Sequence, residues 1–147
     1  MSDTTTLTVE ALFQRVESIF LRAGLNDVQS AALARVITAG ERDACKSHGV
    51  YRIEGALRTV KSGKVKPDAI PQVAEDDGTA IVKVSANGGF ANPAFELGLP
   101  VLVERTKRLG VAALVINDCT HFSALWPEVE GLTENGLAGL VMCPSYA

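Results

Sequence analysis

The sequence predicts an α/β fold in which an N-terminal layer of helices precedes a mixed sheet with a β-α-β unit. Two patterns support this fold class. Apolar residues recur every three or four positions in the first part of the chain, whereas short β-branched or unbroken apolar runs alternate with helical patterns in the rest. A composition of 47% hydrophobic and 21% charged residues over 147 residues is typical of one globular domain.

The helical layer is expected to begin after a short tail. Residues 1–7 are polar and are predicted to form a disordered tail, which leaves residues 8–147 as the ordered part. Apolar stripes predict one helix over residues 9–23 and a second over residues 28–40, joined as a helical hairpin. Suitable capping residues stand at the ends of these helices, namely Thr8, Gly24 and Asn26.

The middle of the chain changes from helix to strand. A third helix is expected from about Ser47 to Lys61, and the β-branched residues 79–84 predict a strand. Residues 87–89, Asn-Gly-Gly, predict a turn with positive φ, and they lack the spacing of either glycine-rich nucleotide-binding motif. A proline at the start of residues 92–109 favours a further helix there.

A β-α-β unit is expected near the C-terminal side of the sequence. Residues 111–116 form an unbroken apolar run that predicts a strand buried on both faces of the sheet. A helix is expected over residues 123–134 and a second buried strand over residues 137–142. Together these elements predict a parallel pair of strands with a right-handed crossover.

Charge and cysteine usage exclude several classes of protein. The formal net charge is -3 and no basic patch stands out, so a nucleic-acid partner is not expected. No apolar run approaches the roughly 18 residues of a membrane span, and the N-terminus lacks the pattern of a secretory signal. Cys45, Cys119 and Cys143 are far apart and form no C-x-x-C pair, which indicates a reducing, cytoplasmic location and no metal site.

The first candidate site contains His48 and Arg52. On a helix with 100° per residue these two side chains lie on one face together with Gly55, opposite the apolar face. Arginine donates paired hydrogen bonds to a carboxylate, and imidazole exchanges a proton near neutral pH. The spacing therefore favours half of a site for a small carboxylic acid that gains or loses a proton. The alternative is a solvated helix face.

The second candidate site follows the strand predicted over residues 111–116. His121 and Ser123 stand between a strand end and a helix start, where open α/β sheets bind ligands. The alternative is a turn in which His121 bonds the backbone and Trp126 fills the core. Cys119 could serve as a thiolate nucleophile, although a bystander cysteine is the favoured interpretation. Two histidines so far apart in sequence disfavour a metal site.

One longer segment resembles a known family. Residues 41–52, Glu-Arg-Asp-Ala-Cys-Lys-Ser-His-Gly-Val-Tyr-Arg, resemble the motif of the type 2 malate/L-lactate dehydrogenases, which are NAD(P)H-dependent oxidoreductases with a non-Rossmann fold. The similarity continues through residues 61–65, 87–90 and 110–122. Within the family, residues 121–130 most resemble the Δ1-piperideine-2-carboxylate/Δ1-pyrroline-2-carboxylate reductases, and the Trp-Pro pair in that segment is the most discriminating feature.

The resemblance implies roles for particular residues. Ser47 and His48 correspond to a proton relay, and Arg52 corresponds to the group that binds the substrate carboxylate. His121 is the second choice for the acid/base. The segment expected to line an NADPH or NADH cofactor comprises His121, Phe122, Ser123, Ala124 and Leu125. The relay aspartate of the family lies beyond residue 147, so the family's fold and site are expected to be incomplete in this chain, which alone should be inactive.

The implied activity is reduction of a cyclic imino acid to L-proline or L-pipecolate. A 2-hydroxy-acid dehydrogenase of the malate, L-lactate or ureidoglycolate type is the first alternative, and a non-catalytic interaction module is the second. The partners implied are a small carboxylate substrate, the C-terminal half of the same enzyme and a second copy in a homodimer.

Overall fold

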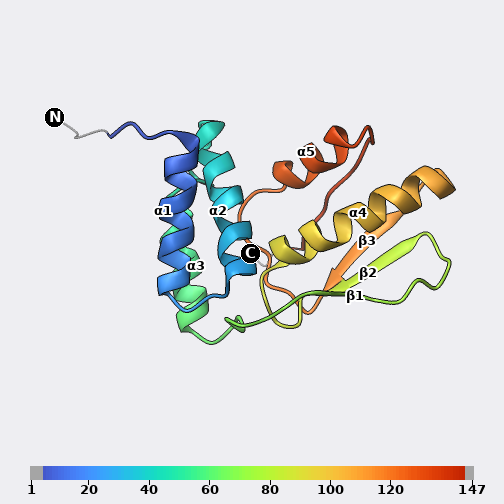
Figure 1. The fold of residues 1–147 in the computed structure, drawn as a ribbon, viewed down its shortest axis with the longest axis horizontal. Helices are drawn as coiled ribbons and strands as arrows, with labels where there is room; N and C mark the ends of the chain where they lie inside the picture. Colours follow the sequence, from blue (N-terminus) through green and yellow to red (C-terminus); the bar gives the residue numbers. More distant parts are fainter. Residues whose placement is uncertain (1–4, 145–147) are drawn as a thin grey trace.

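The computed structural model describes residues 5–144, in which a group of three helices lies beside a sheet carrying two further helices (Figure 1). The elements in chain order are α1 (Val9–Arg22), α2 (Asp27–Arg42), α3 (Arg52–Lys61), β1 (Gln72–Val73), β2 (Ile81–Ser85), α4 (Ala91–Leu109), β3 (Ala113–Asn117) and α5 (Trp126–Glu134). The predicted disordered tail falls partly on residues 1–4, which lie outside the described residues, and residues 5–8 form neither helix nor strand.

The helical hairpin and its caps are confirmed. The side chain of Thr8 accepts a hydrogen bond from the backbone N–H of Ala11 at 3.1 Å, and that of Asn26 accepts one from Gln29 at 2.9 Å. Gly24 follows the end of α1 with φ +94°, a conformation that costs glycine little because it has no Cβ. Short-range sequence signals were sufficient here because each bond joins residues three apart.

A buried glutamine joins the helical layer to the loops beside the sheet. The side-chain amide of Gln29 in α2 donates to the carbonyl oxygens of Lys66 and Pro67 at 3.0 and 2.9 Å, and its oxygen accepts from the N–H of Phe90 at 3.0 Å. All three partners are backbone groups, which need such bonds when they are buried. Gln29 therefore fixes α2 against the segment that starts α4.

The sheet is mixed, and its order is β1-β2-β3. β1 pairs antiparallel with β2, and β2 pairs parallel with β3. The helix α4 connects β2 to β3, so the fold contains a β-α-β unit as the fold class predicted, but the unit is β2-α4-β3 and not the one predicted over residues 111–142. The turn before α4 is confirmed, with φ +52° at Asn87 and +84° at Gly88.

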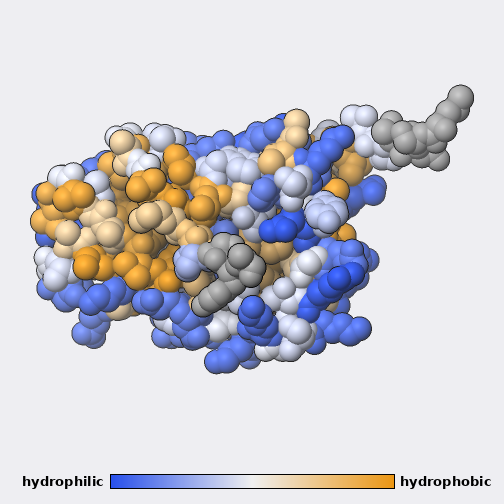
Figure 2. Space-filling model, turned by 180° about the vertical axis from the view of Figure 1, so that it is seen from behind, coloured by the Kyte–Doolittle hydropathy of each residue, from blue (hydrophilic) through white to orange (hydrophobic). Residues whose placement is uncertain are grey.

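The second buried strand predicted over residues 137–142 is wrong for this structure. That segment contains neither helix nor strand, and Leu140 and Met142 are 80% and 81% exposed. The run 111–116 is not buried on both faces either, because exposed and half-buried residues alternate along β3. An apolar run indicates that burial is favourable but does not say what buries it. Here α4 covers one face of the sheet, and no described residue covers the other. Figure 2 shows hydrophobic residues gathered on the back of the molecule, over the half that holds the sheet.

Two helices begin later than the sequence predicted. α3 starts at Arg52 rather than Ser47, because residues 46–51 form turns in which the N–H of Val50 donates to the carboxylate of Glu41 at 2.8 Å. His48 therefore precedes the helix, and its predicted place on a helical face with Arg52 is wrong. α5 starts at Trp126 rather than at Ser123, whose φ of +76° is incompatible with a right-handed helix.

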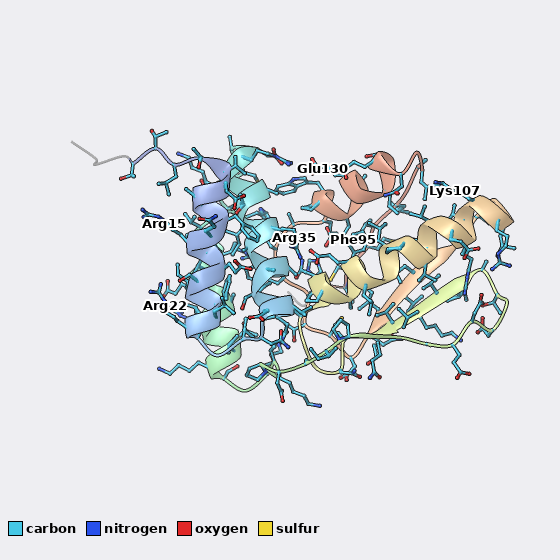
Figure 3. The ribbon with its side chains drawn as sticks, in the orientation of Figure 1. Arg15, Arg22, Arg35, Phe95, Lys107 and Glu130 are labelled. Carbon is cyan, nitrogen blue, oxygen red and sulfur yellow. The ribbon has the colours of Figure 1, made fainter. Side chains whose placement is uncertain are left out.

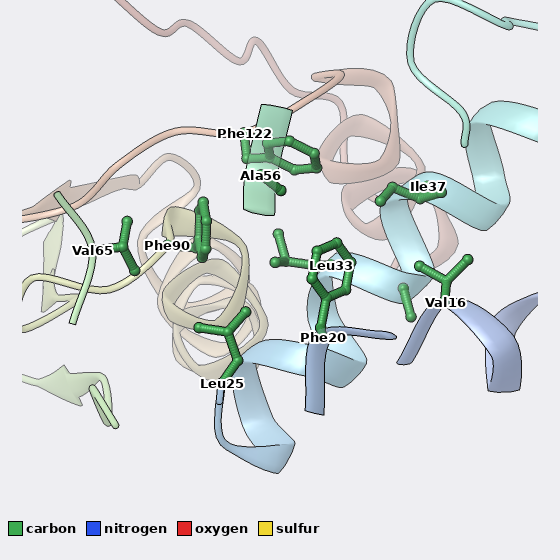
Figure 4. Close-up of a cluster of buried hydrophobic side chains, with 10 residues drawn as sticks. Val16, Phe20, Leu25, Leu33, Ile37, Ala56, Val65, Phe90 and Phe122 are labelled. Atoms are coloured by element: carbon green, nitrogen blue, oxygen red, sulfur yellow. The ribbon is translucent and has the colours of Figure 1, made fainter. Parts of the chain in front are cut away.

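Two apolar clusters stabilise the fold. The first lies among α1, α2 and α3 and is closed by Phe90 and Phe122 from the loops beside the sheet (Figure 4). The second lies between the sheet and α4 and α5, and includes Val82, Val84 and Leu132. Within residues 5–144, no helix combines the length and the apolar character that crossing a membrane requires.

Candidate functional site

The segment after α2 folds back onto the end of that helix. Ala44 has φ +57°, and the N–H of Cys45 donates to the carbonyl of Gly40 at 2.8 Å. Glycine at residue 40 allows the backbone of His48 to pass close to α2, because a Cβ there would lie 2.6 Å from the His48 carbonyl oxygen. The end of α2 thus fixes where the His48 backbone lies.

The imidazole of His48 has two polar neighbours. Its Nδ1 lies 3.0 Å from Ser47 Oγ and 3.5 Å from Cys45 Sγ. When the Ser47 hydroxyl donates to Nδ1, a neutral imidazole carries its proton on Nε2. The predicted Ser47–His48 pair is therefore in hydrogen-bonding contact, and Nε2 is the nitrogen available for a reacting partner.

The loop 121–125 packs directly against this segment. The hydroxyl of Ser123 donates to the carbonyl oxygen of His48 at 3.1 Å. Phe122 is buried and meets Phe90 edge to face, with ring centroids 5.8 Å apart, and Ala124 is also buried. Of the predicted cofactor segment, these side chains hold the loop in place, whereas His121 and Leu125 line a cavity.

Arg52 lies at the first position of α3 and points toward the same loop. Its guanidinium carbon is 5.8 Å from the centroid of the Phe122 ring, within range of a cation–π contact. Its Nε is buried and has no hydrogen-bond partner among the described residues. A buried donor without a partner is uncommon and makes Arg52 a candidate for binding an acceptor such as a carboxylate.

His121 is the second histidine of the site. Its Nε2 is buried and has no hydrogen-bond partner among residues 5–144. Burial, and secondly the positive charge of Arg52, lower the pKa of His121. Since the ordinary value of 6.5 is already below neutral, the lowered pKa favours the uncharged imidazole at neutral pH.

His121 faces a cavity of about 500 Å³ between β3, α5 and the segment 137–144. The walls are mostly apolar, and Glu128 of α5 is among the few polar residues. Glu128 is buried, its Oε2 has no partner among the described residues, and burial raises its pKa. The cavity therefore combines apolar walls with two titratable side chains in unpartnered positions, which is typical of ligand sites.

The environment of Cys119 does not favour a thiolate. The pKa of Cys119 is raised by burial and by the charges of Cys143 and Asp118, so its thiol is less easily ionised than usual. The interpretation of Cys119 as a bystander is consistent with this environment. Within residues 5–144, no three His, Cys, Asp or Glu side chains are grouped so that they could hold a metal ion.

The structure brings the predicted site residues together where residues 45–52 meet the loop 121–125. Two contacts of Trp126 were not predicted from the sequence: its indole N–H donates to Asp43 at 2.9 Å, and its ring meets that of His48 edge to face. The hydrogen-bonded pair is separated by 83 residues, and no local pattern marks it.

The fold has a helical layer and a mixed sheet with a β-α-β unit, and the candidate site contains a Ser-His pair and an arginine. Residues 7–147 match the malate/L-lactate dehydrogenase family, and the chain is a member of that family.

Among curated relatives, a Δ1-pyrroline-2-carboxylate reductase of Agrobacterium fabrum is 90% identical over all 147 residues of this chain, which correspond to 43% of that protein. A Δ1-pyrroline-2-carboxylate/Δ1-piperideine-2-carboxylate reductase of Pseudomonas aeruginosa is 43% identical over 96% of the chain and 42% of its own length. The chain therefore spans less than half the length of these relatives.

Solved structures agree with the fold. The crystal structure of Δ1-piperideine-2-carboxylate reductase from Pseudomonas syringae matches 90% of this chain with a TM-score of 0.86 and 38% identity, over 40% of its own chain. Malate dehydrogenase from Entamoeba histolytica matches 91% of the chain and 37% of its own, with a TM-score of 0.79 and 18% identity, which shows the shared fold alone.

Proposed function

We propose that this chain supplies the proton-transfer and carboxylate-binding part of an NAD(P)H-dependent oxidoreductase that reduces Δ1-pyrroline-2-carboxylate or Δ1-piperideine-2-carboxylate to L-proline or L-pipecolate. The observation that carries the proposal is the Ser47–His48 contact at 3.0 Å, held against the loop 121–125 by the Ser123 hydroxyl. The relatives named above as reductases of these imino acids support the choice of substrate.

Reduction of a cyclic imine needs a hydride at carbon and a proton at nitrogen. In its protonated form, His48 donates its Nδ1–H to Ser47 Oγ at 3.0 Å and gives its Nε2 proton to the imine nitrogen, which leaves a neutral imidazole. The ring then regains a proton at Nε2 from solvent. Positioned acid catalysis of this kind contributes roughly 10²–10⁴-fold to a rate.

Arg52 binds the carboxylate of the substrate. Its buried Nε lacks a partner among the described residues, and the Phe122 ring at 5.8 Å limits the motion of the guanidinium. Two parallel N–H donors fix a carboxylate in one orientation, which sets the direction of the imine carbon. Arg52 thus selects 2-carboxylates and orients them.

The cavity that His121 and Leu125 line has the apolar walls and few polar groups of a cofactor site. A nicotinamide cofactor, when bound, supplies the hydride. His121 offers it an uncharged imidazole with a free Nε2. The backbone of the loop 121–125 is held rigid by the buried side chains of Phe122 and Ala124.

We further propose that the uncovered face of the sheet packs against polypeptide that the longer relatives have beyond the matched region, and that the complete enzyme is a cytoplasmic homodimer. Exposed apolar residues on β3 and in the segment 137–144, among them Val115, Leu140 and Met142, support the first part. Burying such residues is favourable by roughly 25 cal/mol per Å² of apolar surface.

A chimaeric enzyme tests the function. This chain replaces the 147 matched residues of the Agrobacterium fabrum protein, so that it supplies every residue proposed above. Oxidation of NADPH and of NADH is measured with each cyclic imine, and separately with pyruvate and oxaloacetate. We expect turnover with an imine. Activity with the 2-oxo acids alone would instead assign a hydroxy-acid dehydrogenase, and inactivity with every substrate would favour a non-catalytic module.

Variants of the chimaera separate the roles. His48→Gln is expected to lower kcat by about 10²–10⁴-fold. His121→Gln, which retains a hydrogen-bonding side chain, should leave most of kcat. Arg52→Gln should raise KM by about 10–100-fold, the equivalent of one charge-assisted hydrogen bond. A larger loss of kcat in the His121 variant than in the His48 variant would exchange the two histidine roles.

A further inference from the structure

The only tryptophan of the chain lies against the candidate acid/base. The rings of Trp126 and His48 meet edge to face, with centroids 5.7 Å apart and planes at 73°. Such a contact restricts rotation of the imidazole about its Cβ–Cγ bond, since any rotated ring loses the contact. His48 is only half-buried, so few other groups limit that rotation.

The indole is itself held from its far side. Its Nε1–H donates to Asp43 Oδ2 at 2.9 Å. Arg42 binds Asp43 through two hydrogen bonds: its Nε and Nη2 donate to the two carboxylate oxygens at 2.7 and 2.8 Å. Hydrogen bonds from Arg42 and Trp126 lower the pKa of Asp43, which therefore accepts as a carboxylate.

A second bond ties the same two elements. Glu130, which is labelled in Figure 3, lies in α5 one helical turn after Trp126, and Arg42 donates to it at 3.0 Å. The N-terminal part of α5 is thus bonded to the end of α2 at two points, Trp126 and Glu130. Bonds at both points oppose a rotation of α5 about its axis that would carry the indole away from His48.

We infer that Asp43 and Trp126 are positioning residues for His48: the pair Arg42–Asp43 holds the indole, and the indole holds the imidazole in the orientation that proton transfer requires. This inference rests on the proposed function for its effect on turnover, although the effect on the ring of His48 stands without it. Ser47 and Cys45 contact Nδ1 and Ser123 holds the carbonyl oxygen, and Trp126 adds an aromatic contact to the ring.

An ordinary surface ion pair would have a different effect. The Arg42 and Asp43 side chains are 47% and 32% exposed, and pairs with that exposure contribute little to stability. Removal of a purely structural pair should leave kcat unchanged. Removal of a positioning pair should reduce kcat while KM stays nearly constant, because Arg52 still binds the carboxylate.

The test uses substitutions in the chimaera described above. Asp43→Leu and Trp126→Leu should lower kcat by about tenfold or more, with KM changed less than about twofold, as expected when a reacting group is misplaced by a fraction of an ångström. Asp43→Asn keeps an acceptor for the indole and Trp126→Phe keeps the aromatic edge, so each should recover part of the loss. Glu96→Leu is the matched control: it removes an exposed bond from α2 (Arg35) to α4 and should not change kcat.

Magnetic resonance of the chain itself gives a readout independent of turnover. With two histidines, ring labelling yields two imidazole signals, and His48 should be shifted by the ring current of Trp126. Asp43→Leu should remove most of that shift and leave the His121 signal in place. If the chimaera is active but Asp43→Leu changes neither kcat nor the His48 signal, the inference is wrong. If the unmodified chimaera reduces no imine, the proposed function fails while the ring signal still decides the positioning role.

Discussion

Gly40→Ala is predicted to destabilise the chain and to displace His48, although alanine is the better helix former. Gly40 lies inside α2, where replacing glycine with alanine favours the helix by about 1 kcal/mol. The new Cβ would lie 2.6 Å from the carbonyl oxygen of His48 and 2.8 Å from the backbone N of Gly49. These are backbone atoms, which cannot rotate away as a side chain would.

The size of the effect follows from the distance. Ordinary contact begins at 3.4 Å, so the segment carrying His48 must move by about 0.8 Å, the difference between 3.4 and 2.6 Å. Overpacking of this kind costs about 1–3 kcal/mol. After the gain of about 1 kcal/mol in helix propensity, the net loss is about 0–2 kcal/mol. The same movement strains the Ser123–His48 bond and should lower kcat of the chimaera by up to about 10²-fold.

Gly55→Ala is the matched control. Gly55 lies inside α3, and a Cβ there would have no atom within 4 Å. It should therefore stabilise the chain by about 0.5–1 kcal/mol and leave kcat unchanged. Urea unfolding of the chain, followed by circular dichroism, gives the free energies, and initial rates of the chimaera give kcat. If Gly40→Ala stabilises the chain as much as Gly55→Ala and keeps full kcat, the close approach of α2 to His48 does not require glycine at residue 40, and the prediction is wrong.

Three further predictions concern stability. Burial raises the pKa of Glu128, so the folded state favours the protonated carboxyl and loses stability as pH rises through that pKa. Glu128→Gln should therefore be more stable than the wild type at neutral pH and equally stable in acid. Urea unfolding midpoints measured across pH would show this. The lowered pKa of His121 has the opposite sign: stability is full above its ordinary value of 6.5 and falls as pH drops below it, and His121→Gln should flatten that decline. Leu33→Ala, at a fully buried position, should cost about 2–5 kcal/mol, against less than about 1 kcal/mol for the exposed Leu21→Ala, measured by thermal or urea unfolding.

Prediction from the sequence succeeded for features that depend on bonds between residues close together in the chain. Thr8 and Asn26 cap their helices through residues three positions away, and the Ser47–His48 contact joins neighbours. Prediction was poorer where the answer depended on distant groups. The start of α3 depends on the carboxylate of Glu41, which takes the N–H of Val50 and leaves residues 46–51 as turns. No helical periodicity contains that information.

The strand predicted over residues 137–142 was wrong for a related reason. A strand needs a neighbour for its backbone groups, and within residues 5–144 none pairs with this segment. Its apolar residues indicate only that burial is favourable. The bond between Asp43 and Trp126 was missed because it depends on how α2 and α5 meet, which follows from tertiary packing and not from spacing along the chain.

The two histidines lie in contrasting environments, and under the proposed function this contrast gives them different tasks. Nδ1 of His48 is held by Ser47 at 3.0 Å, whereas Nε2 of His121 is buried without a partner among the described residues. Burial and the charge of Arg52 lower the pKa of His121, which keeps that ring uncharged at neutral pH. An uncharged imidazole can donate or accept a hydrogen bond, which suits contact with the nicotinamide cofactor. Under the proposed function we therefore assign that contact to His121, and we assign the proton for the imine nitrogen to His48, whose ring contacts Ser47 and Trp126.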